Sequence, residues 1–171
     1  DHFGDNSADK TLTRARQLLG HEASFHDRFI VAQALNKRER NDEVVEVLDD
    51  KVDCSRDTPA LQLLLPAMIN SDRRKQAHEI IKKLPQEVAD QPFYLSMQAA
   101  VHMIRGDYPA SQRTIERYLQ IRPEDLSMRL KWIYLRMRLG GEMEVRTFLE
   151  GNVEQLEGIP SERMHLAMLL E

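Results

Sequence analysis

Apolar residues recur along this chain at the three- and four-residue spacing that places side chains on one face of a helix. No stretch of useful length alternates between apolar and polar residues, and no β-hairpin signal separates the apolar stretches. Short polar turns join them. The pattern predicts helices over residues 22–37, 42–52, 61–70, 73–84, 94–105, 109–121, 125–139 and 142–156, after a helix that Gly20 ends and before one that Pro160 begins.

Several residues at the ends of these stretches predict where helices start and stop. Asn41 or Asp42 is expected to cap one helix and Asp72 another, because a side-chain oxygen there accepts hydrogen bonds from the first turn. Pro66 lies inside an apolar stretch and is expected to kink its helix or weaken one turn. Residues 86–91 are expected to form the longest connector.

Three sets of small or apolar positions recur at intervals of 33 or 34 residues. Gly106 and Gly140 recur at the same interval, where turns are expected. A fixed interval of this size is typical of stacked helices in which each unit contacts only its neighbours. The recurring sets are Ala32, Leu65, Ala99, Ile133 and Ala167; Val44, Ala77, Ser111 and Val145; and Leu48, Ile81, Ile115 and Leu149.

The repeat over residues 92–125 is the most complete. Its marked positions, in order, are Ala99 in the first helix, Gly106, Asp107 and Tyr108 at the turn, Ser111 and Ile115 in the second helix, and Pro123 after it. This order of small, apolar and proline positions resembles the tetratricopeptide repeat (TPR), a helix–turn–helix unit of about 34 residues. Small residues let the two helices of a pair cross closely, and glycine lets the chain reverse direction.

The resemblance implies an all-α fold, a right-handed α-solenoid of about four TPR-like antiparallel helix pairs with flanking half repeats. Residues 1–7 are polar and contain glycine, so we expect them to fray. Residues 8–171 would then form a single TPR-like repeat domain. The chain starts at Asp1 and stops within an apolar periodic stretch, so we expect it to be a fragment of a longer protein.

Composition narrows the function classes. The net charge is −4, whereas a domain that binds nucleic acid usually carries a basic excess. The single cysteine, Cys54, excludes an internal disulfide and a cysteine-rich metal site. No run of about 18 apolar residues predicts a membrane span, and no signal segment opens the chain. The compartment is not fixed by the sequence, although the cytoplasm is slightly favoured.

No arrangement of residues predicts a catalytic, cofactor-binding or metal site. His21 and His26 are five residues apart rather than at the spacing of a zinc-binding helix. Gly140 and Gly141 lack the flanking strand and lysine of a phosphate-binding loop. Three other histidines fall in separate repeats, at His78, His102 and His165. We therefore expect a protein that is not an enzyme and has no cofactor.

In the family that the chain resembles, the first helix of each pair lines a concave groove that holds a peptide or helix of a partner. The matching positions form a largely apolar, methionine-rich surface, and flexible methionines adapt to apolar partner segments. Methionines that fill gaps between repeats would explain the same pattern. The candidate partner-binding residues in this groove are Phe29, Gln33, Gln62, Ser96, Ala100, Met103, Leu130, Tyr134 and Met137.

Residues 129–138 carry four cationic and two aromatic side chains in one expected helix. Lys131, Tyr134 and Arg138 share one face of it and complete the candidate partner-binding set. This face could contact an anionic side chain of a partner peptide, or grip single-stranded nucleic acid between cation and ring. Alternatively, the cations pair with acidic neighbours such as Glu124 and Glu142.

The favoured hypothesis is a non-enzymatic interaction module that binds a protein, as a peptide or helix, in its concave groove. The alternative is a structural spacer or self-association arm of a larger protein, which includes a homodimer formed through the C-terminal helix. A chaperone of the type III secretion kind and a binder of single-stranded RNA are lower alternatives.

Overall fold

The computed structural model of the chain describes residues 23–49, 52–53 and 58–148. Every regular element in these ranges is an α-helix, which confirms the expected all-α class. Residues 142–148 are also helical. The other helices are α2 (Phe25–Asn36), α3 (Asn41–Leu48), α4 (Pro59–Asn70), α5 (Arg74–Lys83), α6 (Gln86–Ala89), α7 (Pro92–Ile104), α8 (Tyr108–Ile121) and α9 (Leu126–Arg138).

Some predictions fall on residues that the structure does not describe. These are the helix ending at Gly20, the second half of the helix over 142–156 and the helix beginning at Pro160. Leu149 and Ala167 of the recurring sets also lie outside the described ranges.

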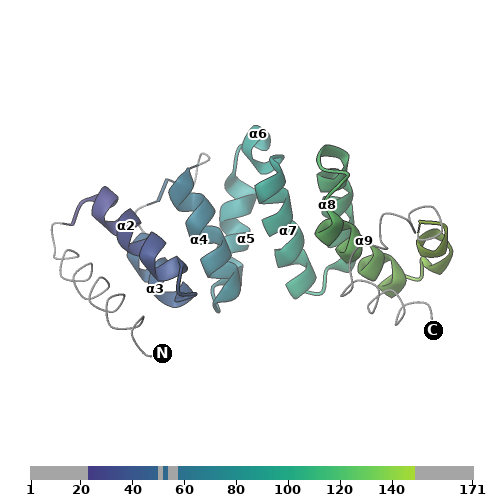
Figure 1. The fold of residues 1–171 in the computed structure, drawn as a ribbon, viewed down its shortest axis with the longest axis horizontal. Coiled ribbons are helices and arrows are strands. Elements are labelled where there is room, and N and C mark those ends of the chain that lie inside the picture. Colours follow the sequence, from purple (N-terminus) through teal and green to yellow (C-terminus); the bar gives the residue numbers. More distant parts are fainter. Residues whose placement is uncertain (1–22, 50–51, 54–57, 149–171) are drawn as a thin grey trace, which may run out of the picture.

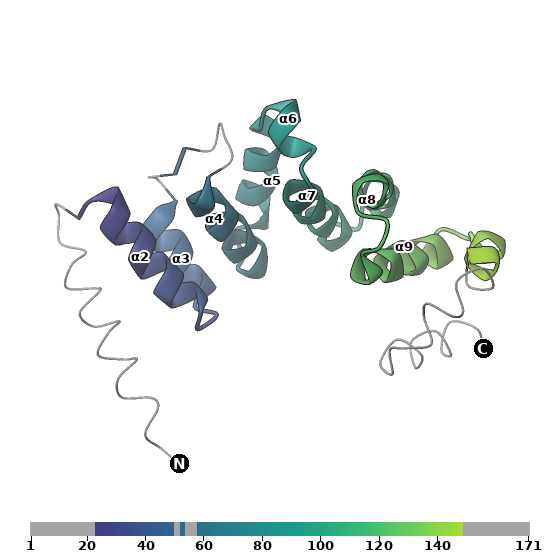
Figure 2. The same ribbon diagram turned by 45° about the horizontal axis from the view of Figure 1, so that its top comes forward.

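The helices follow one another in a row along the long axis of the molecule, with α2 near one end and α9 near the other (Figure 1). The row is bent, with α5 and α6 at the top of the bend (Figure 2). Contacts join helices that are adjacent in sequence, and they also join α2 to α4, α4 to α7 and α5 to α7. Packing restricted to near neighbours in sequence is the arrangement of a helical repeat.

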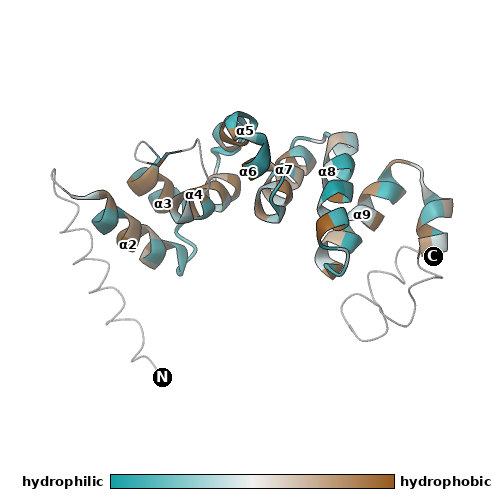
Figure 3. Cartoon of the chain, turned by 90° about the horizontal axis from the view of Figure 1, so that it is seen from above, coloured by the Kyte–Doolittle hydropathy of each residue, from teal (hydrophilic) through white to brown (hydrophobic). Residues whose placement is uncertain are grey.

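The buried side chains form a nearly continuous core through this row. One cluster runs from α2 to α7 and includes Leu35, Leu64 and Tyr94. A second joins α7, α8 and α9, and a third joins α9 to residues 142–148. Apolar residues are prominent on α4 and α7, and hydrophilic ones on α8 (Figure 3).

The recurring positions are the centre of this core. Every described member of the three sets is buried, and none is more than 3% exposed. The interval of 33 or 34 residues therefore marks positions that pack between helices, as a stacked arrangement requires. Because these side chains are buried where helices cross, the size of each one affects how closely its two helices pack.

The turn between α7 and α8 shows how one helix pair closes. Gly106 adopts φ 76°, a left-handed conformation in which a residue with a side chain is strained. The Asp107 carboxylate caps α8 by accepting from the Ala110 N–H at 3.1 Å. Ser111 then lies fully buried against Ala99, and its hydroxyl donates to the Ala99 carbonyl at 2.9 Å. Small side chains at both positions let the helix backbones approach.

Two predicted helix caps are wrong. Asn41 and Asp42 are already helical residues of α3, and Arg40 precedes them without a side-chain cap. The chain reverses earlier, because Glu39 adopts φ 57° and the Arg40 N–H donates to the Leu35 carbonyl at 3.2 Å. A backbone turn of this kind leads into α3 without a side-chain acceptor.

Asp72 is not the cap of α5 either. It lies in the turn before Arg73, which occupies the cap position and makes no side-chain capping bond to α5. Two hydrogen bonds connect the turn to α4 instead. The Ser71 hydroxyl donates to the Met68 carbonyl, and the Arg74 Nε–H donates to the Ile69 carbonyl, each at 3.2 Å. These bonds satisfy carbonyls at the end of α4, and α5 begins at Arg74, one residue later than predicted.

Three other predicted boundaries shift. The helix expected from residue 22 begins at Phe25, because Ser24 and Asp27 form a reciprocal capping box. The expected connector at 86–91 contains the single-turn helix α6, in which Val88 is buried. α4 begins at Pro59, earlier than predicted, and continues through Pro66 to Asn70.

Asp125 joins the end of α8 to the start of α9. Its carboxylate accepts from the Met128 N–H at 3.0 Å and from the Tyr118 hydroxyl at 2.5 Å. The Tyr118 hydrogen bond is the main reason why the pKa of Asp125 lies below its ordinary value of 3.8. The ionised carboxylate is therefore the form that stabilises this junction.

We expect Asp125→Ala to lower the free energy of unfolding by about 1–2 kcal/mol, the cost of losing a helix cap. Because the folded-state pKa is depressed, the contribution is present above pH 3.8 and is lost as the pH falls through the folded-state pKa. Urea unfolding at pH 7 measures the loss. Asp125→Asn keeps an acceptor oxygen and should lose less stability. An Asp125→Ala variant with the free energy of unfolding of the parent would show that the cap contributes nothing.

Candidate functional site

The candidate partner-binding residues lie on α2, α4, α7 and α9, the first helix of each predicted pair. All of them are exposed or half-buried, so a partner can reach their side chains. We call this set the first-helix face. It comprises Phe29, Gln33, Gln62, Ser96, Ala100, Met103, Leu130, Lys131, Tyr134, Met137 and Arg138.

Three of the four helices that carry the first-helix face are in contact with one another. α2 contacts α4, and α4 contacts α7, so the residues on these three helices lie on adjacent elements. α9 is attached mainly through α8. α9 lies near one end of the row of helices, so its residues form that end of the first-helix face (Figure 1).

Three apolar members of the face also contribute to packing. Met103 packs against the cluster of Ala99 and Ile115. Leu130 and Met137 pack against Ile133 and Val145. The half-buried state of these side chains means that they fill space between helices and still present part of their surface to solvent.

The α9 end of the face carries an arginine held by two tyrosines. Arg138 Nε donates to the Tyr134 hydroxyl at 3.0 Å. The guanidinium carbon lies 5.5 Å from the ring centroids of both Tyr134 and Tyr108, within the range of cation–π attraction. The hydrogen bond to Tyr134 raises the pKa of Arg138. Since Tyr108 belongs to α8, the cluster joins two helices.

The other cations of α9 lie in different surroundings. Lys131 is exposed and contacts the Met128 sulfur at 3.8 Å. Arg136 pairs with Glu144 at 3.1 Å rather than with Glu142. Arg129 donates to the Pro123 carbonyl. Of the acidic partners expected for the cations of this helix, neither Glu124 nor Glu142 pairs with Arg138 in the described part of the chain.

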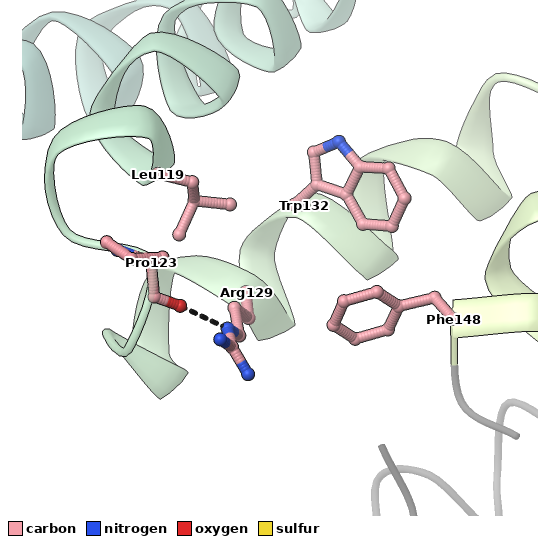
Figure 4. A pocket seen from close by; sticks show the side chains of 5 residues that line it. All are labelled: Leu119, Pro123, Arg129, Trp132 and Phe148. Carbon is pink, nitrogen blue, oxygen red and sulfur yellow. Dashed lines mark hydrogen bonds between the residues drawn. The ribbon is translucent and has the colours of Figure 1, made fainter. Parts of the chain in front are cut away.

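A pocket of about 220 Å³ lies beside α9, between the end of α8 and residues 142–148 (Figure 4). Trp132 and Phe148 form one wall, with ring centroids 5.5 Å apart. The Trp132 Nε1–H donates to Glu116 at 3.1 Å, which fixes the indole. The pocket is lined by Leu119, Pro123, Arg129, Trp132 and Phe148.

The sequence did not predict this pocket. Its residues come from the end of one helix, a turn, the next helix and a third helical stretch. No single helical face contains them, so spacing within one element cannot reveal the site. The one signal in the sequence was the presence of large aromatic residues, Trp132 and Phe148, in successive elements.

His78 and His102 meet edge to face between α5 and α7, with ring centroids 5.7 Å apart. His78 Nδ1 is buried and has no hydrogen-bond partner among the residues that the structure describes. Burial is the main cause that lowers the pKa of both rings, because it penalises the charged imidazolium. The charged groups that also act on the pair are Arg105, Glu79, Lys82, Asp107 and Arg113.

We expect the protein to lose stability as the pH falls below 6.5, the ordinary pKa of histidine. The folded-state pKa values of His78 and His102 lie below that value, so the unfolded chain binds more protons in this range. Urea unfolding at pH values between about 7.5 and 5.5, within about one unit of the ordinary histidine pKa, measures the slope of the free energy of unfolding against pH. A His78→Gln/His102→Gln variant should show a shallower slope, and an identical slope would contradict the assignment.

Two features are absent from the described residues. No group of three or more histidine, cysteine, aspartate or glutamate side chains there is placed to hold a metal ion. Within the same ranges, no helix has the length and apolar character needed to cross a membrane. Comparisons with known protein families, with curated proteins and with solved structures find no match.

Proposed function

We propose that this chain is a TPR-like interaction module, a right-handed solenoid whose first-helix face binds a peptide or helix of a partner protein. The observation that carries the proposal is the burial of the recurring positions. They are at most 3% exposed, while the matching outward positions on α2, α4, α7 and α9 stay accessible. Repeats that stack through one set of residues present the other set as an extended surface.

The composition of the face supports a peptide as the ligand. Small or flexible side chains such as Ser96, Ala100 and Met103 occupy its α7 portion. Met103 is half-buried and unbranched, so it can adjust to an apolar side chain of the partner. Gln33 is exposed, and its side-chain amide can exchange hydrogen bonds with the backbone of a bound peptide.

Two matched alanines allow a direct test. Ala100 lies on the first-helix face in α7, and Ala110 lies in the first turn of α8; both are half-buried. Peptides are selected from a random display library on the parent protein, and their affinities are measured for Ala100→Glu and Ala110→Glu. We expect Ala100→Glu to weaken binding by about tenfold or more, because it buries a charge in the contact.

Ala110→Glu should bind like the parent and remain folded, since an acidic residue in a first helical turn is favourable. Circular dichroism checks that both variants are helical. Equal affinities of the two variants, or the recovery of no peptide at all, would contradict the proposal. Either result would favour the alternative, a spacer or self-association arm.

A further inference from the structure

Arg138 differs from four other arginines of the described helices and turns in what holds its side chain. Those four pair with carboxylates, in the pairs Arg40–Glu43, Arg73–Asp49, Arg117–Asp90 and Arg136–Glu144. Arg138 has no carboxylate partner among the residues that the structure describes. Two phenol rings hold it instead.

The hydrogen bond to Tyr134 leaves the outer end of the guanidinium available. Nε donates to the Tyr134 hydroxyl, and within the described part of the chain the two Nη groups make no hydrogen bond. Two parallel N–H groups of this kind match the two oxygens of a carboxylate. The flanking rings restrict the side chain before a ligand arrives, so less conformational entropy is lost on binding.

We propose that Arg138, held between Tyr108 and Tyr134, anchors an aspartate or glutamate side chain of the partner peptide. This inference rests on the proposed function and adds the chemistry of its ligand. Apolar residues beside the acidic one would contact Tyr108 and Met103, which pack against the same buried cluster. The partner segment is therefore an acidic residue within an apolar sequence.

Charge favours a peptide over a nucleic acid at this position. A single-stranded nucleic acid is usually held by several cations along its backbone. Here Lys131 shares the face with Arg138, but it acts on the carboxylate of Asp125, whose pKa it helps to lower. The chain as a whole carries a net charge of −4. Arg138 is the only arginine in the first-helix face, and one guanidinium suits one carboxylate.

The test combines selection with a double-mutant cycle. Peptides are selected from a random display library on the parent protein, and the tightest binder is measured with Arg138→Gln, Arg138→Lys and the control Arg113→Gln. Arg113 is an exposed arginine of α8 outside the first-helix face. The same peptide is then made with its acidic residue replaced by the amide, and a uridine decamer is titrated at low salt.

We expect one acidic position to be enriched and Arg138→Gln to weaken binding about tenfold, the effect of one charge-assisted hydrogen-bonded pair. The amide peptide should bind Arg138→Gln and the parent equally, because the partner charge is gone. Arg138→Lys should recover only part of the affinity, since lysine lacks the planar fork. Arg113→Gln should match the parent.

Other outcomes overturn the inference in distinguishable ways. In one outcome, the selected peptides show no acidic preference and yet bind Ala100→Glu more weakly than the parent. That result would reject the role of Arg138 as an anchor and leave the proposed function in place. Recovery of no peptide would reject both. Binding of the uridine decamer that is lost in Arg138→Gln would assign the cluster to nucleic acid. All variants are checked by circular dichroism, and the exposure of Arg138 makes misfolding unexpected.

Discussion

Replacing Ser111 with leucine is expected to destabilise the protein by about 2–4 kcal/mol, through overpacking and a lost hydrogen bond. Ser111 is 0% exposed and lies where α8 crosses α7. Its hydroxyl donates to the Ala99 carbonyl at 2.9 Å, so the two backbones are close. A leucine side chain has no space there and would have to force the helices apart.

Urea unfolding followed by circular dichroism measures this effect against two controls. Ser111→Ala removes the hydrogen bond without adding volume and should cost about 1 kcal/mol. Gln120→Leu adds apolar volume at an exposed position of the same helix and should stay within about 0.5 kcal/mol of the parent. A Ser111→Leu variant as stable as Ser111→Ala would show that the crossing is not close-packed.

Replacing Tyr94 with alanine should cost about 3–5 kcal/mol, the range for removing a large aromatic side chain from a core. Tyr94 is 0% exposed and belongs to the cluster that runs from α2 to α7. Its ring packs edge-on against Phe93, with centroids 5.0 Å apart. Alanine would leave a cavity among the side chains of this cluster.

The loss should be uneven along the chain, because a repeat arrangement is stabilised mainly by contacts between neighbours. Amide hydrogen exchange in Tyr94→Ala should lose protection most in α2–α7 and least in residues 142–148. Tyr134→Ala is the matched control, since Tyr134 is 39% exposed and its loss should cost about 1 kcal/mol at most. A uniform loss of protection in Tyr94→Ala would instead indicate one cooperative unit.

The recurring positions could be predicted because they depend on a physical requirement that is visible in sequence. Ala99, Ser111 and Ile115 must be small or aliphatic to pack between helices, and repetition of that requirement gives the 33- or 34-residue interval. The turn at Gly106 could also be predicted, because its φ of 76° is a conformation that favours glycine.

Helix ends were harder to predict because several local hydrogen bonds compete for the same groups. Asn41, Asp42 and Asp72 are all good capping residues, yet a backbone turn leads into α3, and side chains at the turn before α5 donate to carbonyls of the preceding helix. The single turn of α6 depends on burial of Val88 against other helices. That contact cannot be read from the residues of the segment itself.

The candidate site was predictable only within single helices. Tyr134 and Arg138 are four residues apart, so helical spacing places them together. Tyr108 joins them because α9 packs against α8, which brings together residues about 30 positions apart in sequence. The pocket beside Trp132 was missed for the same reason, as its walls come from several elements.

The most direct test of the account is to map the binding surface in solution. The tightest peptide from the display selection is titrated into isotope-labelled protein, and amide chemical shifts are followed by NMR. The account predicts that the largest shifts fall on α2, α4, α7 and α9, with Ala100 and Tyr134 among the affected residues. Shifts concentrated on α5 and α8 would contradict it and place the partner on the opposite helices of each pair.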